Sequence, residues 1–327
     1  MNILFISTLF PNSLQPGRGR FHFDQLRALK ALGCRFRVVA PVPWEPLRLL
    51  SGGTFPHGLP ALETVEGFEV SHPRQLYVPL WRGPGNGALF ARSVAREAGR
   101  QVREFAPDFF WAGFAFPEGE AVARLARDHR LPFVVSLLGS DINSSRHYPR
   151  RWKAIVGALK QAAVVLAKSR ALKEIVVEAG IPAEKVHLDY NGVDQDTFRP
   201  VSKAEACKSL EIDAHCRRVL FVGNLVAIKD VPTLVRAVGF VRQKLAGKKA
   251  VELVLLGDGT EKNAIQGLAR RLGIAEAVRM PGRLSRERVA QWMRASDVLC
   301  LPSLHEGVPN VVLESLASGR PVAASRV

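Results

Sequence analysis

Two segments far apart in the chain share one order of elements, and this order limits the folds that the chain can adopt. Residues 2–9 form a short apolar run, followed by a Pro- and Gly-rich loop and an amphipathic segment around residues 21–32. Residues 218–223 form a second apolar run that ends in Gly, followed by a loop and a helical pattern over residues 232–245. Strand, glycine-bearing loop and helix form the unit from which doubly wound α/β sheets are built.

The same alternation continues through both halves of the chain. Further apolar runs, each typical of a short buried strand, lie at residues 35–41, 132–139, 162–168, 185–192, 251–259, 277–282, 297–303 and 320–327. Helical patterns such as residues 118–130 separate some of them, which predicts parallel sheets with helices on both faces. A polar, turn-rich stretch lies between the halves. We therefore expect two Rossmann-like domains, residues 1–198 and 199–327.

Length and composition exclude several classes of protein. A chain of 327 residues with 47% hydrophobic and 23% charged residues can bury two cores and is not typical of a disordered protein. No apolar run is long enough to cross a bilayer, and the first strand is too short for a signal sequence, so we expect a cytoplasmic protein. The cysteines lack C-x-x-C pairs and the histidines lack metal-ligand spacing, so we expect reduced thiols, no metal and no cofactor.

The net charge of +16 is the unusual bulk property. Nucleic acid, an anionic membrane surface or a polyphosphorylated substrate would each explain it, and so would a solvated basic surface. Because no nucleic-acid-binding motif accompanies the charge, we expect no nucleic acid partner. We favour an anionic membrane, which would place the protein at the inner face of the cell membrane.

Residues 41–92 do not follow the alternation. They are rich in Pro and Gly and contain the aromatic residues Trp44, Phe55, Tyr77 and Trp81. Two interpretations are open: an insertion that contacts a membrane or an acceptor, or an irregular connection whose aromatic side chains fill the core. The other end of the chain also departs from the pattern, because no helix follows the strand predicted near Val327. We therefore expect the second domain to be incomplete.

Residues 301–322 carry the strongest functional signal. Glu306 follows a predicted strand, and Glu314 lies eight positions later in a helix that begins near Pro309. The N–H groups of Gly307, Val308 and Asn310 would then converge at the positive end of a helix, which favours an anion. Glu306 would accept hydrogen bonds from sugar hydroxyls, and Glu314 would bind the vicinal diol of a ribose. The structural alternative is that Glu306 caps the helix and Glu314 lies on the surface.

The surrounding pattern E-G-x-P-N-x-x-x-E-x-x-A-x-G-x-P-V resembles the signature of glycosyltransferase family 4, and this favours the functional interpretation. The resemblance implies a GT-B fold, in which two Rossmann-like domains face each other across a cleft. It also places Lys229 at the family lysine, which stabilises the diphosphate of the leaving nucleotide. Gly223 and Asn224 belong to the same loop, where Asn224 and Asp230 replace an arginine and a glycine usual in the family.

Other loops resemble family loops that contact the donor. Two of them follow predicted strands and would line the nucleobase pocket through Gly257, Gly259, Gly282 and Arg283. A third, residues 11–21, would close toward the donor phosphates through Gly17 and Gly19, assisted by Arg18 or Arg20. Asp141 is a candidate contact on the acceptor side, although an Asp after a Gly-Ser turn is also typical of a helix cap. Gly113 and Leu138 stand where many relatives have histidines, which questions the acceptor chemistry.

The resemblance implies transfer of a sugar from a nucleoside diphosphate sugar to an acceptor hydroxyl, with retention at the anomeric carbon and no metal. The acceptor would be a saccharide or a lipid-linked saccharide, as in cell-surface polysaccharide or glycolipid synthesis. Two alternatives stay open: a nucleotide-sugar epimerase on the same fold, and a non-catalytic nucleotide-sugar-binding remnant. The missing histidines favour the remnant.

Overall fold

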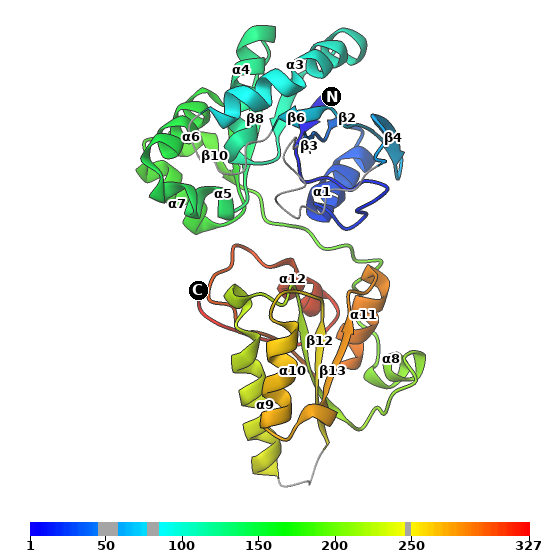
Figure 1. Cartoon of the computed structure of the whole chain (residues 1–327). Coiled ribbons are helices and arrows are strands. Elements are labelled where there is room, and N and C mark those ends of the chain that lie inside the picture. Colours follow the sequence, from blue (N-terminus) through cyan, green and yellow to red (C-terminus); the bar gives the residue numbers. More distant parts are fainter. Residues whose placement is uncertain (45–57, 77–84, 246–249) are drawn as a thin grey trace. The chain divides into compact units, whose positions relative to one another are not determined.

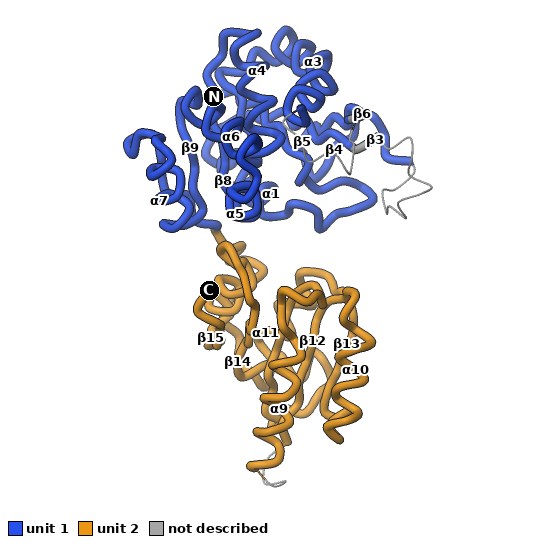
Figure 2. The backbone as a smooth tube through the Cα atoms, turned by 60° about the vertical axis from the view of Figure 1, so that its left-hand side comes forward, with its two compact units in different colours: residues 1–191 blue, residues 192–327 orange. Residues whose placement is uncertain are grey.

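The computed structural model describes residues 1–44, 58–76, 85–245 and 250–327. They form two compact units, Met1–Asn191 and Gly192–Val327 (Figure 2). Of the aromatic residues noted between 41 and 92, Phe55, Tyr77 and Trp81 lie outside the described residues. None of the described helices combines the length and apolar character that a membrane span needs.

The first unit contains a sheet of eight strands in the order β10-β9-β8-β7-β1-β2-β5-β4. The strands are parallel except β4, which pairs antiparallel with β5 at one edge. Their bounds are β1 Asn2–Ile6, β2 Arg35–Val39, β4 Leu62–Val65, β5 Phe68–Ser71, β7 Phe109–Ala112, β8 Phe133–Leu137, β9 Val164–Ala167 and β10 Val186–Leu188. A separate parallel pair is formed by β3 (Val42–Trp44) and β6 (Arg74–Leu76).

Helices cover both faces of this sheet, as the sequence predicts (Figure 1). Alternate residues of β1 show this directly. Leu4 and Ile6 belong to a core with α3 and α4, whereas Ile3 and Phe5 belong to a core with α1. The helices of this unit are α1 Arg20–Ala31, α3 Asn86–Phe105, α4 Glu120–His129, α5 Ser140–Asn143, α6 Pro149–Gln161 and α7 Arg170–Glu178.

The second unit contains a parallel sheet of five strands in the order β13-β12-β11-β14-β15. The strands are β11 Arg217–Val222, β12 Val251–Leu256, β13 Val278–Gly282, β14 Val298–Leu301 and β15 Val322–Ala324. The helices are α8 Lys203–Ser209, α9 Val231–Leu245, α10 Lys262–Arg271, α11 Arg286–Ala295 and α12 Asn310–Ala317. One face packs on α9 and α10 and the other on α11, so this sheet is also buried on both sides (Figure 1).

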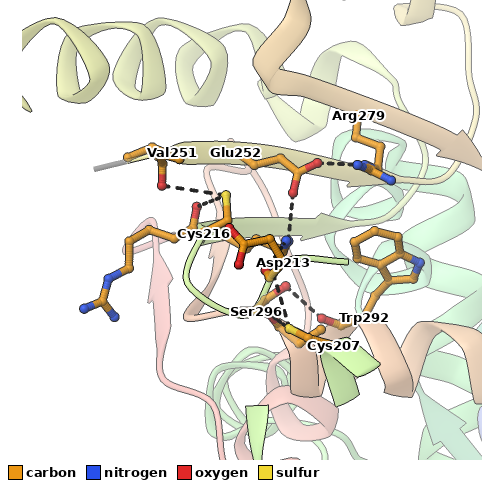
Figure 3. Close-up of polar contacts among 12 residues, drawn as sticks. Cys207, Asp213, Cys216, Val251, Glu252, Arg279, Trp292 and Ser296 are labelled. Carbon is orange, nitrogen blue, oxygen red and sulfur yellow. Dashed lines mark hydrogen bonds and ion pairs between the residues drawn. The ribbon is translucent and has the colours of Figure 1, made fainter. Parts of the chain in front are cut away.

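A buried arginine fixes the end of this sheet where the strands begin. The side chain of Arg218 is 2% exposed, and its Nε donates to Oε2 of Glu252 at 2.7 Å. Its Nη2 donates to the carbonyl of Asp213 at 2.6 Å. Figure 3 shows Glu252 also paired with Arg279, at 2.7 Å. These bonds satisfy a buried charge and join the segment after α8 to β11, β12 and β13.

Along the chain, the boundary between the two compact units falls between Asn191 and Gly192. This is earlier than the predicted boundary after residue 198. Phe198 explains the difference. It is 1% exposed and packs with Leu220 and Trp292 in the second unit. The polar stretch that looks like a linker therefore carries a core residue of the second unit.

Within residues 41–92, the described part is more regular than the sequence predicts. Residues 62–71 form the hairpin of β4 and β5, which continues the main sheet, and α3 begins at Asn86. Of the two interpretations left open, the irregular connection does not describe these residues, because β5 adds in parallel to β2 through Val70. The four cysteines are free, but only Cys207 is fully buried.

Candidate active site

The predicted donor residues of the second unit lie together because its strands are parallel. Gly223 follows β11, Gly257 follows β12, and Gly282 ends β13. Glu306 follows β14 in the loop before α12. The carboxyl ends of parallel strands meet at one edge of a sheet, where ligands bind in open α/β folds.

Main-chain hydrogen bonds join these loops to one another. The N–H of Leu304 donates to the carbonyl of Ile228 at 2.8 Å, and the N–H of Gly257 donates to the carbonyl of Gly282 at 2.9 Å. The N–H of Leu225 donates to the carbonyl of Asp258 at 3.0 Å. One of these bonds, from Leu304 to Ile228, attaches the loop that carries Glu306 directly to the loop that carries Lys229, which holds the two side chains near each other.

Lys229 and Glu306 form an ion pair across 77 residues of sequence. The Lys229 Nζ donates to Oε1 of Glu306 at 2.5 Å, and the two side chains are 23% and 14% exposed. Ser303 Oγ donates to the same oxygen at 2.7 Å. The structure therefore brings the two predicted catalytic residues into contact, at the edge of the sheet where a ligand would bind.

The start of α12 offers main-chain donors next to this pair. The helix begins at Asn310, and Pro309 is the preceding cap residue. No described residue accepts a hydrogen bond from the N–H of Gly307 or Val308. Unpaired amides before a helix, together with the positive end of its dipole, favour an anion.

Glu314 lies farther along α12 and faces an arginine that the sequence did not single out. Its Oε1 is 3.9 Å from Nη2 of Arg286, and the side chains are 16% and 20% exposed. The guanidinium of Arg286 also lies 5.1 Å from the ring of Phe198. Glu314 is thus neither a surface side chain nor fully buried, and its carboxylate lies within ion-pair distance of an arginine on α11.

Two residues near Lys229, Asn224 and Asp230, differ from the family pattern, and the structure shows what each does locally. Asp230 adopts a left-handed conformation with φ of 42°, which accounts for the glycine usual at this position. Asn224, in place of the usual arginine, accepts a hydrogen bond from Arg283 Nη2 at 3.5 Å. An arginine from the neighbouring loop therefore lies beside the position that lost its own positive charge.

Gly257 is required by the close approach of two loops. It has φ of +140°, and a Cβ at this position would lie 1.9 Å from the carbonyl oxygen of Gly223. At Gly259 a Cβ would lie 2.3 Å from the carbonyl oxygen of Leu225. Both glycines therefore let adjacent loops touch through their main chains.

We expect Gly257→Ala to lower the free energy of unfolding by about 2 kcal/mol or more, because backbone strain adds to the steric overlap. Urea unfolding followed by circular dichroism measures the change. Gly267→Ala is the matched control: it lies within α10, where the nearest atom to a new Cβ is 3.6 Å away. The control should not be destabilised. Equal midpoints for both variants would contradict the prediction.

In the first unit, the predicted amino-terminal loop is held by its own side chains. Gly19 has φ of +59°, and a Cβ there would lie 2.1 Å from the carbonyl oxygen of Leu9, whereas a Cβ on Gly17 would meet nothing within 4 Å. Arg18 Nε donates to the carbonyl of Thr8 at 2.8 Å. Arg20 pairs with Glu66. Both arginines that were candidates for assisting donor binding therefore bond within their own unit.

Asp141 is 4% exposed and accepts hydrogen bonds only from main-chain N–H groups among the described residues. Three come from its own turn, and the fourth comes from Ala115 after β7, at 2.9 Å. The carboxylate thus binds the main chain of the turn that leads into the short helix α5 and ties this turn to the loop after β7. Contact with a substrate stays a prediction for this residue and for Gly17 and Gly19.

A cluster of buried polar side chains near Thr8, which follows β1, was not predicted from the sequence. Glu118 is fully buried, and its Oε1 accepts from the N–H and the Oγ1 of Thr8, both at 2.7 Å. Burial, helped by the charge of the nearby Asp141, raises the pKa of Glu118 to about 7 against the lowering effect of these hydrogen bonds. His22 is also fully buried, and burial together with the charge of Lys168 lowers its pKa to about 3.

The space around Gly113 shows whether the histidine that many relatives have at this position would fit in this chain. A Cβ on Gly113 would lie 2.6 Å from Ser7 and 3.0 Å from Nε2 of His22. Any larger side chain at position 113 would therefore collide with these two residues.

Within the described part of the chain, no three His, Cys, Asp or Glu side chains are grouped so that they could hold a metal ion.

Comparison with known proteins identifies the family of the chain. Residues 17–197 match the family model described as Glycosyltransferase Family 4, and residues 216–327 match the model described as Glycosyl transferases group 1. The chain is 30% identical to the putative teichuronic acid biosynthesis glycosyltransferase TuaC of Bacillus subtilis, over 100% of this chain and 81% of the relative.

Solved structures show the same fold. Sucrose-phosphate synthase from Thermosynechococcus elongatus superposes with a TM-score of 0.78 at 18% identity, covering 100% of this chain and 82% of that one. The HepE protein of Anabaena, in complex with UDP and glucose, gives a TM-score of 0.70 at 22% identity, with coverages of 100% and 81%. Both predictions from the sequence, the GT-B fold of two Rossmann-like domains and a transferase enzyme, are confirmed. The chain belongs to glycosyltransferase family 4.

Proposed function

We propose that this glycosyltransferase moves a sugar from a nucleoside diphosphate sugar to an acceptor hydroxyl, with retention at the anomeric carbon. The observation that carries the proposal is the contact of Lys229 with Glu306 at the carboxyl edge of the second sheet, beside unpaired main-chain amides. A cation and amides suit a diphosphate, and a carboxylate suits a sugar.

The diphosphate would bind between Lys229 and the amides of Gly307 and Val308. As the bond between the anomeric carbon and the phosphate oxygen breaks, negative charge builds up on the leaving diphosphate. The ammonium group of Lys229 and the positive end of α12 would stabilise that charge in the transition state. Lys229 is only 23% exposed, so its charge would act with little screening by water.

The two carboxylates would select the donor. Glu306 would accept hydrogen bonds from sugar hydroxyls, and Glu314 would accept from the two hydroxyls of the ribose. The pairing of Glu314 with Arg286 supports the second role, because it orients the carboxylate before the nucleotide binds. Gly257, Gly259, Gly282 and Arg283 would line the nucleobase pocket.

The named relatives suggest which substrates to try first. The HepE structure contains UDP and glucose, and TuaC is named for teichuronic acid biosynthesis. We therefore place a uridine diphosphate sugar first among the donors and a saccharide or lipid-linked saccharide of the cell surface among the acceptors. The net charge of +16 supports contact with an anionic membrane at the inner face of the cell.

Turnover of labelled donors tests the proposal. The protein is incubated with UDP-glucose, GDP-mannose and ADP-glucose labelled in the sugar, with and without a membrane extract as a source of acceptor. We expect slow release of labelled sugar from one donor without acceptor, and its transfer with the extract. An isomerised donor would indicate an epimerase, and binding without turnover would indicate a remnant. Either result would contradict the proposal.

A further inference from the structure

A buried serine that the sequence analysis did not single out lies beside Glu306. Ser303 is 1% exposed, and it follows β14 by two positions. Its Oγ donates to Oε1 of Glu306 at 2.7 Å. Because the serine is buried and part of the segment that leaves the sheet, its hydroxyl offers a fixed donor to a side chain that is itself only 14% exposed.

The two oxygens of Glu306 have different surroundings. Oε1 accepts from both Ser303 and Lys229, at 2.7 and 2.5 Å. Oε2 accepts no hydrogen bond from any described residue. It is also not fully buried, so solvent reaches it. One oxygen is therefore held by the protein, while the other is accessible to a ligand.

Lys229 cannot be a constant partner of Glu306 if a diphosphate binds. The charge of a diphosphate competes with the carboxylate for the ammonium group, and it is the stronger competitor because it carries more negative charge. When Lys229 turns toward the diphosphate, the hydrogen bond from Ser303 remains. A carboxylate that lost both partners would be free to rotate, and its oxygens would lose their fixed directions.

We propose that Ser303 is a positioning residue that holds Oε1 of Glu306, so that Oε2 faces the sugar hydroxyls while Lys229 passes from Glu306 to the diphosphate. This inference rests on the proposed function and deepens it. It separates two parts of donor recognition: the diphosphate depends on Lys229 and the amides, whereas the sugar depends on Ser303 through Glu306.

The test compares Ser303→Ala with Ser303→Thr, which keeps a hydroxyl on Cβ. Turnover is measured with whichever of UDP-glucose, GDP-mannose and ADP-glucose the wild type uses, and affinity is measured with the matching UDP, GDP or ADP. Ser303→Ala should lower turnover about 10-fold to 100-fold, as expected for a misplaced reacting group. Its affinity for the free nucleoside diphosphate should stay within about twofold, because that ligand lacks the sugar that Glu306 would bind. Ser303→Thr should recover most of the turnover.

Ser296→Ala is the matched control. Ser296 is also 1% exposed, but its Oγ donates only to the carbonyl of Trp292 within α11. This control should keep wild-type turnover, which shows that loss of a buried hydroxyl alone is not sufficient. Thermal midpoints of all variants identify any that fail to fold.

Three outcomes would overturn the inference: unchanged turnover in Ser303→Ala, an equal loss of nucleoside diphosphate affinity and turnover, or no recovery in a folded Ser303→Thr. A wild type that turns over none of the three nucleotide sugars would contradict the proposed function itself, and the inference would fall with it. The two failures are therefore distinguishable.

Discussion

Glu306→Gln is expected to lower donor turnover by about 10²-fold to 10³-fold while leaving the binding of the free nucleoside diphosphate intact or slightly tighter. The amide still accepts the hydrogen bond from Ser303 but carries no negative charge, so it binds sugar hydroxyls less strongly in the transition state. It also releases Lys229 from its ion pair, so the ammonium group is available to the diphosphate.

Glu276→Gln is the control for this variant. Glu276 pairs with Arg242, is 66% exposed, and precedes β13, at the opposite end of the sheet from the loops that carry Lys229 and Glu306. Labelled-donor turnover and calorimetric titration with the nucleoside diphosphate measure the two effects. Equal turnover in both variants would show that Glu306 takes no part in the reaction. Loss of affinity for the nucleoside diphosphate would show that the substitution disrupts the whole site.

Glu118→Gln is expected to gain about 3 kcal/mol of stability relative to the wild type as the pH rises from 4.5 to above 7. Burial raises the pKa of Glu118 from 4.5 to about 7, so the native state prefers the protonated carboxyl. As the pH rises from 4.5 to 7, the unfolded chain releases this proton first, and the wild type loses stability at about 1.4 kcal/mol per pH unit. Glutamine resembles the protonated form and avoids this loss.

His22 gives the opposite dependence, because burial lowers its pKa from 6.5 to about 3. Its contribution is complete above pH 6.5 and is lost as the pH falls toward 3, since the unfolded chain binds a proton that the native state excludes. Between pH 4.5 and 6.5 the slopes of Glu118 and His22 therefore oppose each other. Removing the Glu118 carboxyl should expose the His22 slope, so that Glu118→Gln becomes less stable as the solution is acidified.

Urea unfolding at pH 5, 6, 7 and 8 measures this effect. Glu104→Gln is the control, because Glu104 lies on α3 with a side chain that is 58% exposed. The difference in free energy of unfolding between Glu118→Gln and the wild type should grow with pH up to about 7 and then remain constant. A difference that does not change with pH would show that Glu118 is already ionised in the native state.

Much of the fold could be predicted because its signals are local. The strands that were predicted, such as those beginning at residues 2 and 218, are continuous apolar runs, and both faces of each are buried. The helix α3 and the hairpin of β4 and β5 were missed. Their segment begins with Pro- and Gly-rich sequence, and β4 is an edge strand whose exposed alternate positions give no apolar run.

The site shows the same division. Lys229 and Glu306 were both predicted because each lies within a recognisable motif, and parallel strands then place the two motifs at one edge. Their contact with each other, the hydrogen bond from Ser303 to Glu306 and the pairing of Arg286 with Glu314 depend on side chains from separate loops and helices. Such pairings leave no pattern in one sequence. The buried Glu118 and His22 were missed for the same reason.

Calorimetric titration of UDP, GDP and ADP into the wild type, Lys229→Met and Lys244→Met tests the central claim most directly. Lys244 lies at the far end of α9 and serves as the control for loss of one positive charge. The account predicts that one nucleotide binds the wild type and Lys244→Met alike, and that Lys229→Met weakens its binding at least about 10-fold, which corresponds to about 1.4 kcal/mol. Binding of equal strength to all three proteins would contradict a diphosphate site at Lys229, and so would the absence of binding to any of them.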